Sequence, residues 1–184
     1  MTRLEAALVD LVSVMEALRI PYALIGGLAV SLWGEVRATL DVDLVVWVTP
    51  DETNRTVDAL SERFRPVPKD PRDFVRATRV LPLTTGSGVR ADIVFGAFLV
   101  EKELIERAVP REVAGIVVRL ASIEDLVLMK LVSERQRDAE DARRLLRRHG
   151  GTLDRGYLEP KVAELAESLA RPEILRLLSE ALGE

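Results

Sequence analysis

The chain has 184 residues and a net charge of −4, and apolar residues make up 48% and charged residues 30% of it. This composition is typical of a soluble globular protein with a sizeable core, and it excludes a protein that binds nucleic acid through its bulk charge. There is no cysteine and one histidine, His149, which excludes disulfides, Cys/His zinc sites and thiol nucleophiles. Chemistry based on carboxylates and metal ions is therefore the main remaining option for a catalytic site.

The N-terminal segment predicts a helix that ends near Leu18. Thr2 and Glu5 have the spacing of a capping box, and apolar residues then recur at helical intervals. Acidic residues within this segment argue against a signal peptide, and the longest uncharged run, residues 20–34, is too short to span a bilayer. We therefore expect a cytoplasmic protein that makes no membrane contact.

A buried strand, a glycine turn and a helix follow. The strand is expected over Tyr22–Ile25, the turn at Gly26 and Gly27, and the helix over residues 28–33. Backbone amides at a glycine turn before a helix predict an anion-binding site.

The next predicted strand, residues 40–48, is strongly apolar but carries Asp41 and Asp43. Residues two apart on a strand point to the same face, so the two carboxylates lie side by side. In so apolar a strand they repel each other and lose hydration, and a divalent cation would relieve both penalties. The alternative is a pair of exposed carboxylates near the edge of a sheet.

A helix is expected over residues 51–64, then a proline-rich loop over 65–71 and a helical turn over 73–77. Residues 78–83 and 89–95 predict an antiparallel strand pair. Asp92 lies in the second strand, on the same face as Arg90. It either pairs with an arginine such as Arg90 or joins Asp41 and Asp43 as a third carboxylate.

The chain then predicts a helix over residues 99–108, which Pro110 ends, and a single strand over 113–120 with a break at Gly115. Ser122 is the expected N-cap of the following helix. Lys130 interrupts an apolar run in that helix, so it either extends to solvent or meets a buried anion.

Residues 135–148 contain six arginines and predict a basic helix. Asp138 and Asp141 are neighbours on it and are expected to pair with Arg135, Arg137 or Arg144. A solvated face with internal ion pairs is the default interpretation, and an edge that binds a polyanion is the alternative. His149 is expected in the last turn, and residues 153–170 and 172–182 predict two final helices.

Two sets of residues resemble known families. Gly26-Gly27, the run Arg37-Ala38-Thr39-x-Asp41-x-Asp43 and the later Asp92 resemble the nucleotidyltransferase superfamily, which has the DNA polymerase beta-like fold. The residues from Glu124 to Lys130-Leu131, and Arg135-x-Arg137-Asp138-x-x-Asp141, resemble the AbiEii-type branch, which includes toxins of toxin–antitoxin and phage-defence systems. The resemblance covers residues 22–146.

The resemblance implies an α+β fold with a small, mostly antiparallel sheet flanked by helices. Residues 1–120 would form the core, and residues 121–184 a helical region packed on it. The implied activity is metal-dependent transfer of a nucleoside monophosphate (NMP) from an NTP to an acceptor hydroxyl.

The resemblance also implies a role for each residue. Asp41, Asp43 and Asp92 would hold Mg²⁺ or Mn²⁺, and Asp92 would help to deprotonate the attacking hydroxyl. Lys130 would act at the leaving pyrophosphate. The triphosphate would be bound by Gly26, Gly27, Arg37, Thr39 and Lys130, and the distal residues Arg135, Arg137, Asp138 and Asp141 would support the site.

Two functional hypotheses follow. In the first, the protein is an NMP-transferring enzyme whose acceptor is an RNA such as tRNA, a protein or a small molecule, with an antitoxin as a partner if it is a toxin. In the second, it is a catalytically inactive module of the same fold that binds a nucleotide or a partner.

Overall fold

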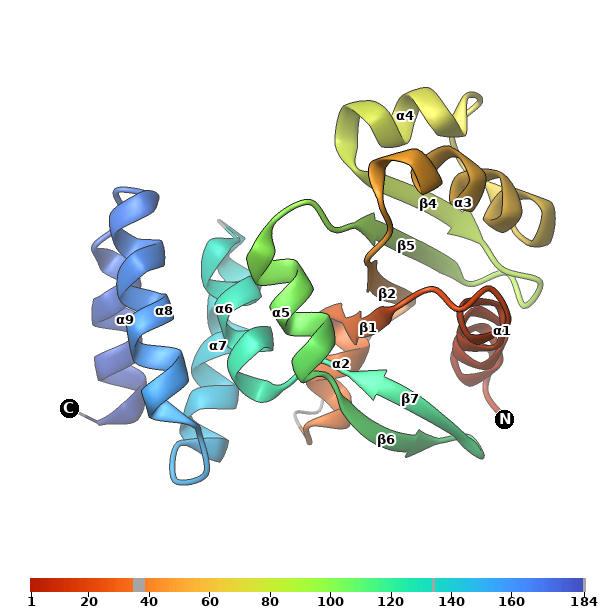
Figure 1. Cartoon of the computed structure of the whole chain (residues 1–184). Coiled ribbons are helices and arrows are strands. Elements are labelled where there is room, and N and C mark those ends of the chain that lie inside the picture. Colours follow the sequence, from red (N-terminus) through yellow and green to blue (C-terminus); the bar gives the residue numbers. More distant parts are fainter. Residues whose placement is uncertain (35–38, 134, 184) are drawn as a thin grey trace. The chain divides into compact units, whose positions relative to one another are not determined.

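The structure is a computed structural model that describes residues 1–34, 39–133 and 135–183 (Figure 1). None of the helices in these ranges is long and apolar enough to cross a membrane. In chain order the elements are α1 (Arg3–Ala17), β1 (Tyr22–Ile25), α2 (Gly26–Leu32), β2 (Asp41–Val46), α3 (Pro50–Arg63), β3 (Arg65–Pro66), α4 (Pro71–Thr78), β4 (Val80–Thr84), β5 (Arg90–Phe95), α5 (Leu99–Arg107), β6 (Val109–Val113), β7 (Ile116–Leu120), α6 (Ile123–Val132), α7 (Gln136–His149), α8 (Arg155–Ser168) and α9 (Glu173–Leu182).

The chain divides into two compact units. The first holds Met1–Ala29 and the described part of Arg37–Ala121, and the second holds the described part of Val30–Val36 and Ser122–Glu184. The first unit therefore contains every strand of the described residues, and the second is helical. The predicted packing of a helical region on the core stays a prediction.

The sheet of the first unit has the strand order β3-β4-β5-β2-β1-β7-β6 among the described residues. The pairs β1–β2, β3–β4, β4–β5 and β6–β7 are antiparallel, and β2–β5 and β1–β7 are parallel. This mixed, mostly antiparallel sheet with helices confirms the predicted α+β class. β1 lies inside the sheet and is buried along its whole length, as its unbroken apolar sequence predicts.

Helices pack on the sheet within this unit. The capping box of α1 forms as predicted, because the Thr2 hydroxyl accepts from the Glu5 amide at 3.1 Å and the Glu5 carboxylate accepts from the Thr2 amide at 2.6 Å. Helix α3 begins at Pro50 after the N-cap Thr49, and α3 and α4 lie together over the β4–β5 part of the sheet (Figure 1).

The prediction of one strand over residues 113–120 is wrong, because β6 and β7 form an antiparallel hairpin there. The two residues between them, Ala114 and Gly115, both have positive φ, 51° and 83°. Two such residues make the tight turn whose twist matches paired strands. Alanine rarely adopts this conformation, so the turn was not visible in the sequence. Pro110 lies in β6, the edge strand of the sheet. A proline is tolerated there because its missing N–H does not interrupt the hydrogen bonds of an interior strand.

Two smaller predictions between α3 and β4 also change. The expected loop over residues 65–71 contains the two-residue strand β3, which pairs with β4. The expected single helical turn is the longer helix α4, whose N-cap Asp70 accepts from the Asp73 amide at 3.1 Å.

Polar contacts join the helices of the second unit. Ser122 caps α6 as predicted, because its hydroxyl accepts from the Asp125 amide at 3.1 Å. The same hydroxyl donates to the Asp125 carboxylate at 2.7 Å, and the Tyr157 hydroxyl of α8 donates to that carboxylate at 2.7 Å. A buried carboxylate on α6 is thereby bonded to α8.

Lys130 is the centre of a second buried cluster. Its ammonium contacts the carboxylates of Asp138 and, at 3.2 Å, of Asp141, and the Ser133 hydroxyl donates to Asp138 at 2.7 Å. Lys130 is 7% exposed, Asp138 8% and Asp141 3%. Of the two alternatives for Lys130, the structure shows the second, in which its ammonium meets buried anions. Sequence reasoning did not name this lysine of α6 as a partner of the two aspartates. Their expected pairing with Arg135, Arg137 or Arg144 stays a prediction.

Removal of the lysine tests how much this cluster contributes to stability. Lys130→Ala would remove the ammonium that contacts both buried carboxylates, and we expect the free energy of unfolding to fall by about 3–5 kcal/mol. Arg144→Ala is the control on the neighbouring helix. It removes the exposed Arg144–Glu140 pair, 4.0 Å apart, and is expected to change stability by less than about 1 kcal/mol. Urea unfolding followed by circular dichroism measures both, and equal losses would contradict the assignment.

Candidate active site

The parallel pairing of β2 with β5 brings the predicted carboxylates together. In its register Asp41 lies opposite Arg90, and Asp43 lies opposite Asp92. Partners in such a pair have side chains on the same face of the sheet, about 5 Å apart. The prediction that the strand of Asp92 lies beside the strand of Asp41 and Asp43 is confirmed.

The two faces of this strand pair differ in burial. Val42, Leu44, Ala91 and Ile93 are fully buried. The residues that alternate with them are partly or fully exposed: Asp41, Asp43 and Asp92 are half-buried and Arg90 is exposed. The carboxylates therefore line a face that solvent and a ligand can reach, while the opposite face belongs to the core.

Asp41 and Asp92 each have a partner from a nearby residue. The Thr39 hydroxyl donates to Asp41 Oδ1 at 2.8 Å, and Arg90 Nε lies 3.2 Å from Asp92 Oδ1. The two alternatives considered for Asp92 thus occur together, since it pairs with Arg90 and also lies beside Asp43. Sequence reasoning named Arg90 as a partner of Asp92 but missed that it also lies opposite Asp41, because strand register is not visible in a single sequence.

Gly26 lies against the third carboxylate. It has φ +70°, and a Cβ built on it would be 1.8 Å from Asp43 Oδ2. No side chain fits in that space, and glycine is the residue that adopts this φ without strain. Residues 26–32 are helical, so the helix begins at Gly26 itself, two residues earlier than expected. Gly27 is buried in its first turn.

The donor chemistry of this face suits a hard divalent cation, because three carboxylates supply the oxygen ligands that Mg²⁺ and Mn²⁺ take. In the structure, Asp41 and Asp92 are turned toward Thr39 and Arg90. Within residues 1–34, 39–133 and 135–183, no three acidic or histidine side chains are gathered closely enough to hold a metal ion. Closing the three carboxylates on one ion therefore requires side-chain rotation, and the metal site stays a prediction.

The remaining predicted site residues fall into two groups. Arg37 lies outside the described residues. Lys130, Asp138 and Asp141 form the buried cluster of the second unit, and the exposed Arg135 and Arg137 lie at the start of α7. The role of Lys130 at the pyrophosphate stays a prediction, as does the supporting role of the distal residues.

Solved structures share this fold at low sequence identity. The antibiotic-resistance factor ANT(2'')-Ia is 17% identical with a TM-score of 0.57, covering 92% of this chain and 94% of that chain. An antigenic nucleotidyltransferase-like protein from Paracoccidioides brasiliensis is 21% identical with a TM-score of 0.56, covering 97% and 91%. The lincosamide antibiotic adenylyltransferase LnuA, bound to lincomycin, is 17% identical with a TM-score of 0.52, covering 77% and 95%.

No curated protein matches the sequence. A sequence family does, over residues 2–148, and its description is a nucleotidyltransferase of unknown function, DUF6036. The match spans both strands of the carboxylate face and the lysine–aspartate cluster. This chain therefore belongs to the DUF6036 family of nucleotidyltransferases.

Proposed function

We propose that this protein transfers an NMP from an NTP to an acceptor hydroxyl, with Mg²⁺ or Mn²⁺ held by Asp41, Asp43 and Asp92. The observation that supports this most directly is the β2–β5 register, which puts Asp43 beside Asp92 on a half-exposed face. The bound metal would act as a Lewis acid on the phosphate oxygens.

In the proposed reaction, the acceptor oxygen forms a bond to the α-phosphorus while the bond between the α-phosphorus and the bridging oxygen to the β-phosphate breaks. Pyrophosphate leaves with that oxygen. Asp92 is proposed to take the proton of the acceptor hydroxyl, and its half-buried position keeps it within reach of an incoming substrate. The backbone at Gly26 and Gly27 is proposed to bind the triphosphate, beside the carboxylate of Asp43.

For the acceptor, we propose a small polyhydroxylated molecule first. Fold neighbours of this chain include a lincosamide antibiotic adenylyltransferase and an ANT(2'') enzyme solved with an adenylylated tobramycin, which supports this class. RNA is the second candidate, and its support is the exposed arginines of α7, such as Arg144 and Arg147. Each candidate has its own support, so the assay includes both classes of acceptor.

Loss of one carboxylate tests the catalytic proposal. We expect Asp43→Asn and Asp92→Asn each to lower NMP transfer by at least about a hundredfold, because each removes a charged oxygen ligand while it preserves side-chain volume. The measurement uses four α-labelled NTPs with Mg²⁺, against total RNA and against a panel of small hydroxyl compounds. Asp10→Asn, on the exposed surface of α1, is the matched control and should retain full transfer.

The labelled product separates the candidates. Label on small compounds alone excludes the RNA proposal, and label on RNA alone excludes the small-molecule proposal. Transfer that persists in both active-site variants excludes these carboxylates as metal ligands. A wild-type protein that binds NTP in a thermal-shift assay but transfers nothing to any acceptor supports the inactive module.

Gly26 provides a second test of the same site. Gly26→Ala adds a methyl group where Asp43 Oδ2 lies, and it also strains a positive φ. Gly88→Ala strains a similar φ, +78°, but its methyl group meets nothing within 4 Å. Gly88→Ala should cost about 1 kcal/mol of stability through the strained φ, and Gly26→Ala should cost more because of the added clash with Asp43. Only Gly26→Ala should lower NMP transfer, by about tenfold or more, because it displaces the carboxylate. Equal transfer by the two variants would count against a role for Gly26 in orienting Asp43.

Membership of the AbiEii-type toxin branch is a finer proposal, and its support is the sequence resemblance of the distal residues. If the protein is a toxin, we expect its induced expression in a bacterial host to arrest growth, whereas Asp43→Asn expressed to the same level should not. Equal growth of the two cultures would exclude toxicity through NMP transfer in that host, and with it the need for an antitoxin partner.

A further inference from the structure

The carboxylate face carries an arginine among its acids. Arg90 begins β5 and lies opposite Asp41 in the β2–β5 register, and Asp92, two residues further along β5, lies opposite Asp43. Residues two apart on a strand share a face, as do partners across a strand pair. The four side chains therefore lie together on one face, where three carboxylates outnumber one guanidinium.

The guanidinium of Arg90 is partly engaged. Its Nε lies 3.2 Å from Asp92 Oδ1, and its two terminal nitrogens have no hydrogen-bond or ion-pair partner among the residues that the structure describes. The side chain of Arg90 is 59% exposed. An ion pair this exposed adds little to stability, because water solvates both charges when they separate. Arg90 can therefore leave Asp92 readily and turn to another anion.

The oxygen that Arg90 contacts belongs to a proposed metal ligand. A guanidinium beside Asp92 Oδ1 occupies a position that a metal ion would take, and its charge repels an approaching cation. Asp41 differs in this respect, since its Oδ1 accepts from the neutral hydroxyl of Thr39 at 2.8 Å. Arg90 therefore competes directly with a metal ion for the carboxylate of Asp92.

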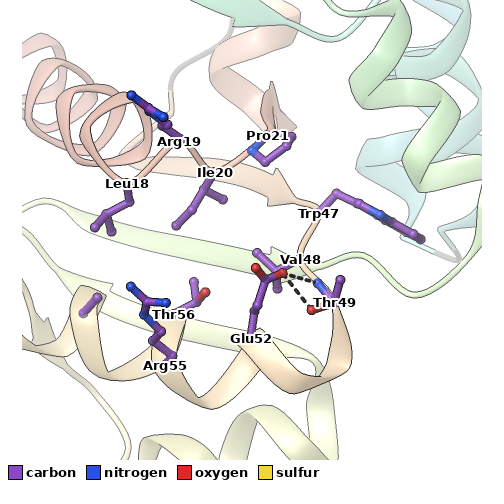
Figure 2. A pocket seen from close by; sticks show the side chains of 11 residues that line it. Leu18, Arg19, Ile20, Pro21, Trp47, Val48, Thr49, Glu52, Arg55 and Thr56 are labelled. Atoms are coloured by element: carbon purple, nitrogen blue, oxygen red, sulfur yellow. Dashed lines mark hydrogen bonds between the residues drawn. The ribbon is translucent and has the colours of Figure 1, made fainter.

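Two other arginines of the first unit, Arg19 and Arg55, lie toward the far end of β2. They come from different segments and line a cavity of about 310 Å³, which the connection from α1 to β1, the residues after β2 and one side of α3 form (Figure 2). Trp47, which also lines this cavity, is about 13 Å along the strand from Asp43, at about 3.3 Å per residue. Their charge is thus placed away from the proposed NTP site, whereas Arg90 lies within it.

We propose that Arg90 pairs with two anions in turn: with Asp92 while the face holds no metal, and with a phosphate oxygen of the NTP once a metal ion has taken Asp92. The inference rests on the proposed function, since it needs both the cation and the NTP. A divalent cation offsets the excess negative charge of the face, and the triphosphate then adds negative charge that the released guanidinium can bind. The planar fork of arginine nitrogens suits phosphate oxygens. Arg90 is therefore a substrate-binding residue that also competes with the metal in the empty site.

The proposal predicts that one substitution changes the affinities for two ligands in opposite directions. Arg90→Gln removes the competing cation, so Mn²⁺ without NTP should bind about three- to tenfold more tightly. The same variant should bind inorganic tripolyphosphate, added with Mg²⁺, about tenfold more weakly, because it loses the charged fork. Electron paramagnetic resonance of the free ion measures Mn²⁺ binding, and amide chemical shifts of the full chain measure tripolyphosphate binding. Neither measurement depends on NMP transfer or on the base of the NTP.

Two further variants serve as controls. Arg76→Gln removes an exposed arginine of α4 that pairs with Asp73 at 2.8 Å, so it changes the net charge equally and should alter neither affinity. Arg90→Lys keeps the charge without the fork, so it should keep the Mn²⁺ affinity within about twofold and restore part of the tripolyphosphate affinity. The thermal midpoint should hardly change in any of the three, because the pairs are exposed. A purely structural role for Arg90 would lower the midpoint and leave both affinities unchanged.

The outcomes separate this inference from the proposed function. If the wild type binds Mn²⁺ but Arg90→Gln gives any pattern other than the opposite shifts, the inference is wrong and the carboxylate site stands. If Mn²⁺ does not bind, or if Asp43→Asn leaves its affinity unchanged, the metal site fails and the inference fails with it. If the opposite shifts occur and no acceptor is labelled, Arg90 has the proposed role in a protein that binds NTP without transfer.

Discussion

The parallel pairing of β2 with β5 is the constraint on which the candidate active site depends. It places the carboxylate of Asp43 directly beside that of Asp92, an arrangement that weakens a sheet because like charges repel. The opposite face of the same two strands offsets this, since Val42, Leu44 and Ile93 are fully buried there. Hydrophobic burial on one face therefore keeps a charge conflict in place on the other, and such local conflicts are typical of functional sites.

Gly26, at the start of α2, has a structural role besides the proposed binding of phosphate. Asp43 Oδ2 occupies the space in which any side chain at Gly26 would begin. The first turn of α2 and the first half of β2 can approach this closely only because that position lacks a Cβ. The same residue thus brings backbone amides and a carboxylate side by side, and both groups are needed where a metal–nucleotide complex is to bind.

The charged side chains of the second unit and those of the carboxylate face differ in their burial. In the second unit, the buried Lys130 ammonium contacts the carboxylates of both Asp138 and Asp141, where an unpaired charge would be costly. The carboxylates of β2 and β5 are half-buried, and the exposed Arg90 pairs with Asp92 there. The first set of charges is therefore enclosed by the helices, whereas the second lies on a face that a ligand can reach.

Patterns that act over a few residues were readable from the sequence. The capping box of Thr2 and Glu5, the N-cap at Ser122 and the buried strand Tyr22–Ile25 depend on neighbours in the chain, and each forms as predicted. The shared face of Asp41 and Asp43 follows in the same way from the two-residue period of a strand. The resemblance of these residues to nucleotidyltransferases pointed to the family that the match over residues 2–148 then established.

The tertiary structure alone decided which distant groups meet. Three examples are the register that sets Asp43 beside Asp92, the contacts of Lys130 with Asp138 and Asp141, and the carboxylate that fills the space at Gly26. Each joins residues from different elements. The periodicity of the sequence cannot select among such pairings, because several acidic and basic residues occur in equivalent local patterns. Only the packing of the whole core determines which of them meet. The turn at Ala114 was hidden for the same reason, since tertiary packing overrides the local preference of that residue.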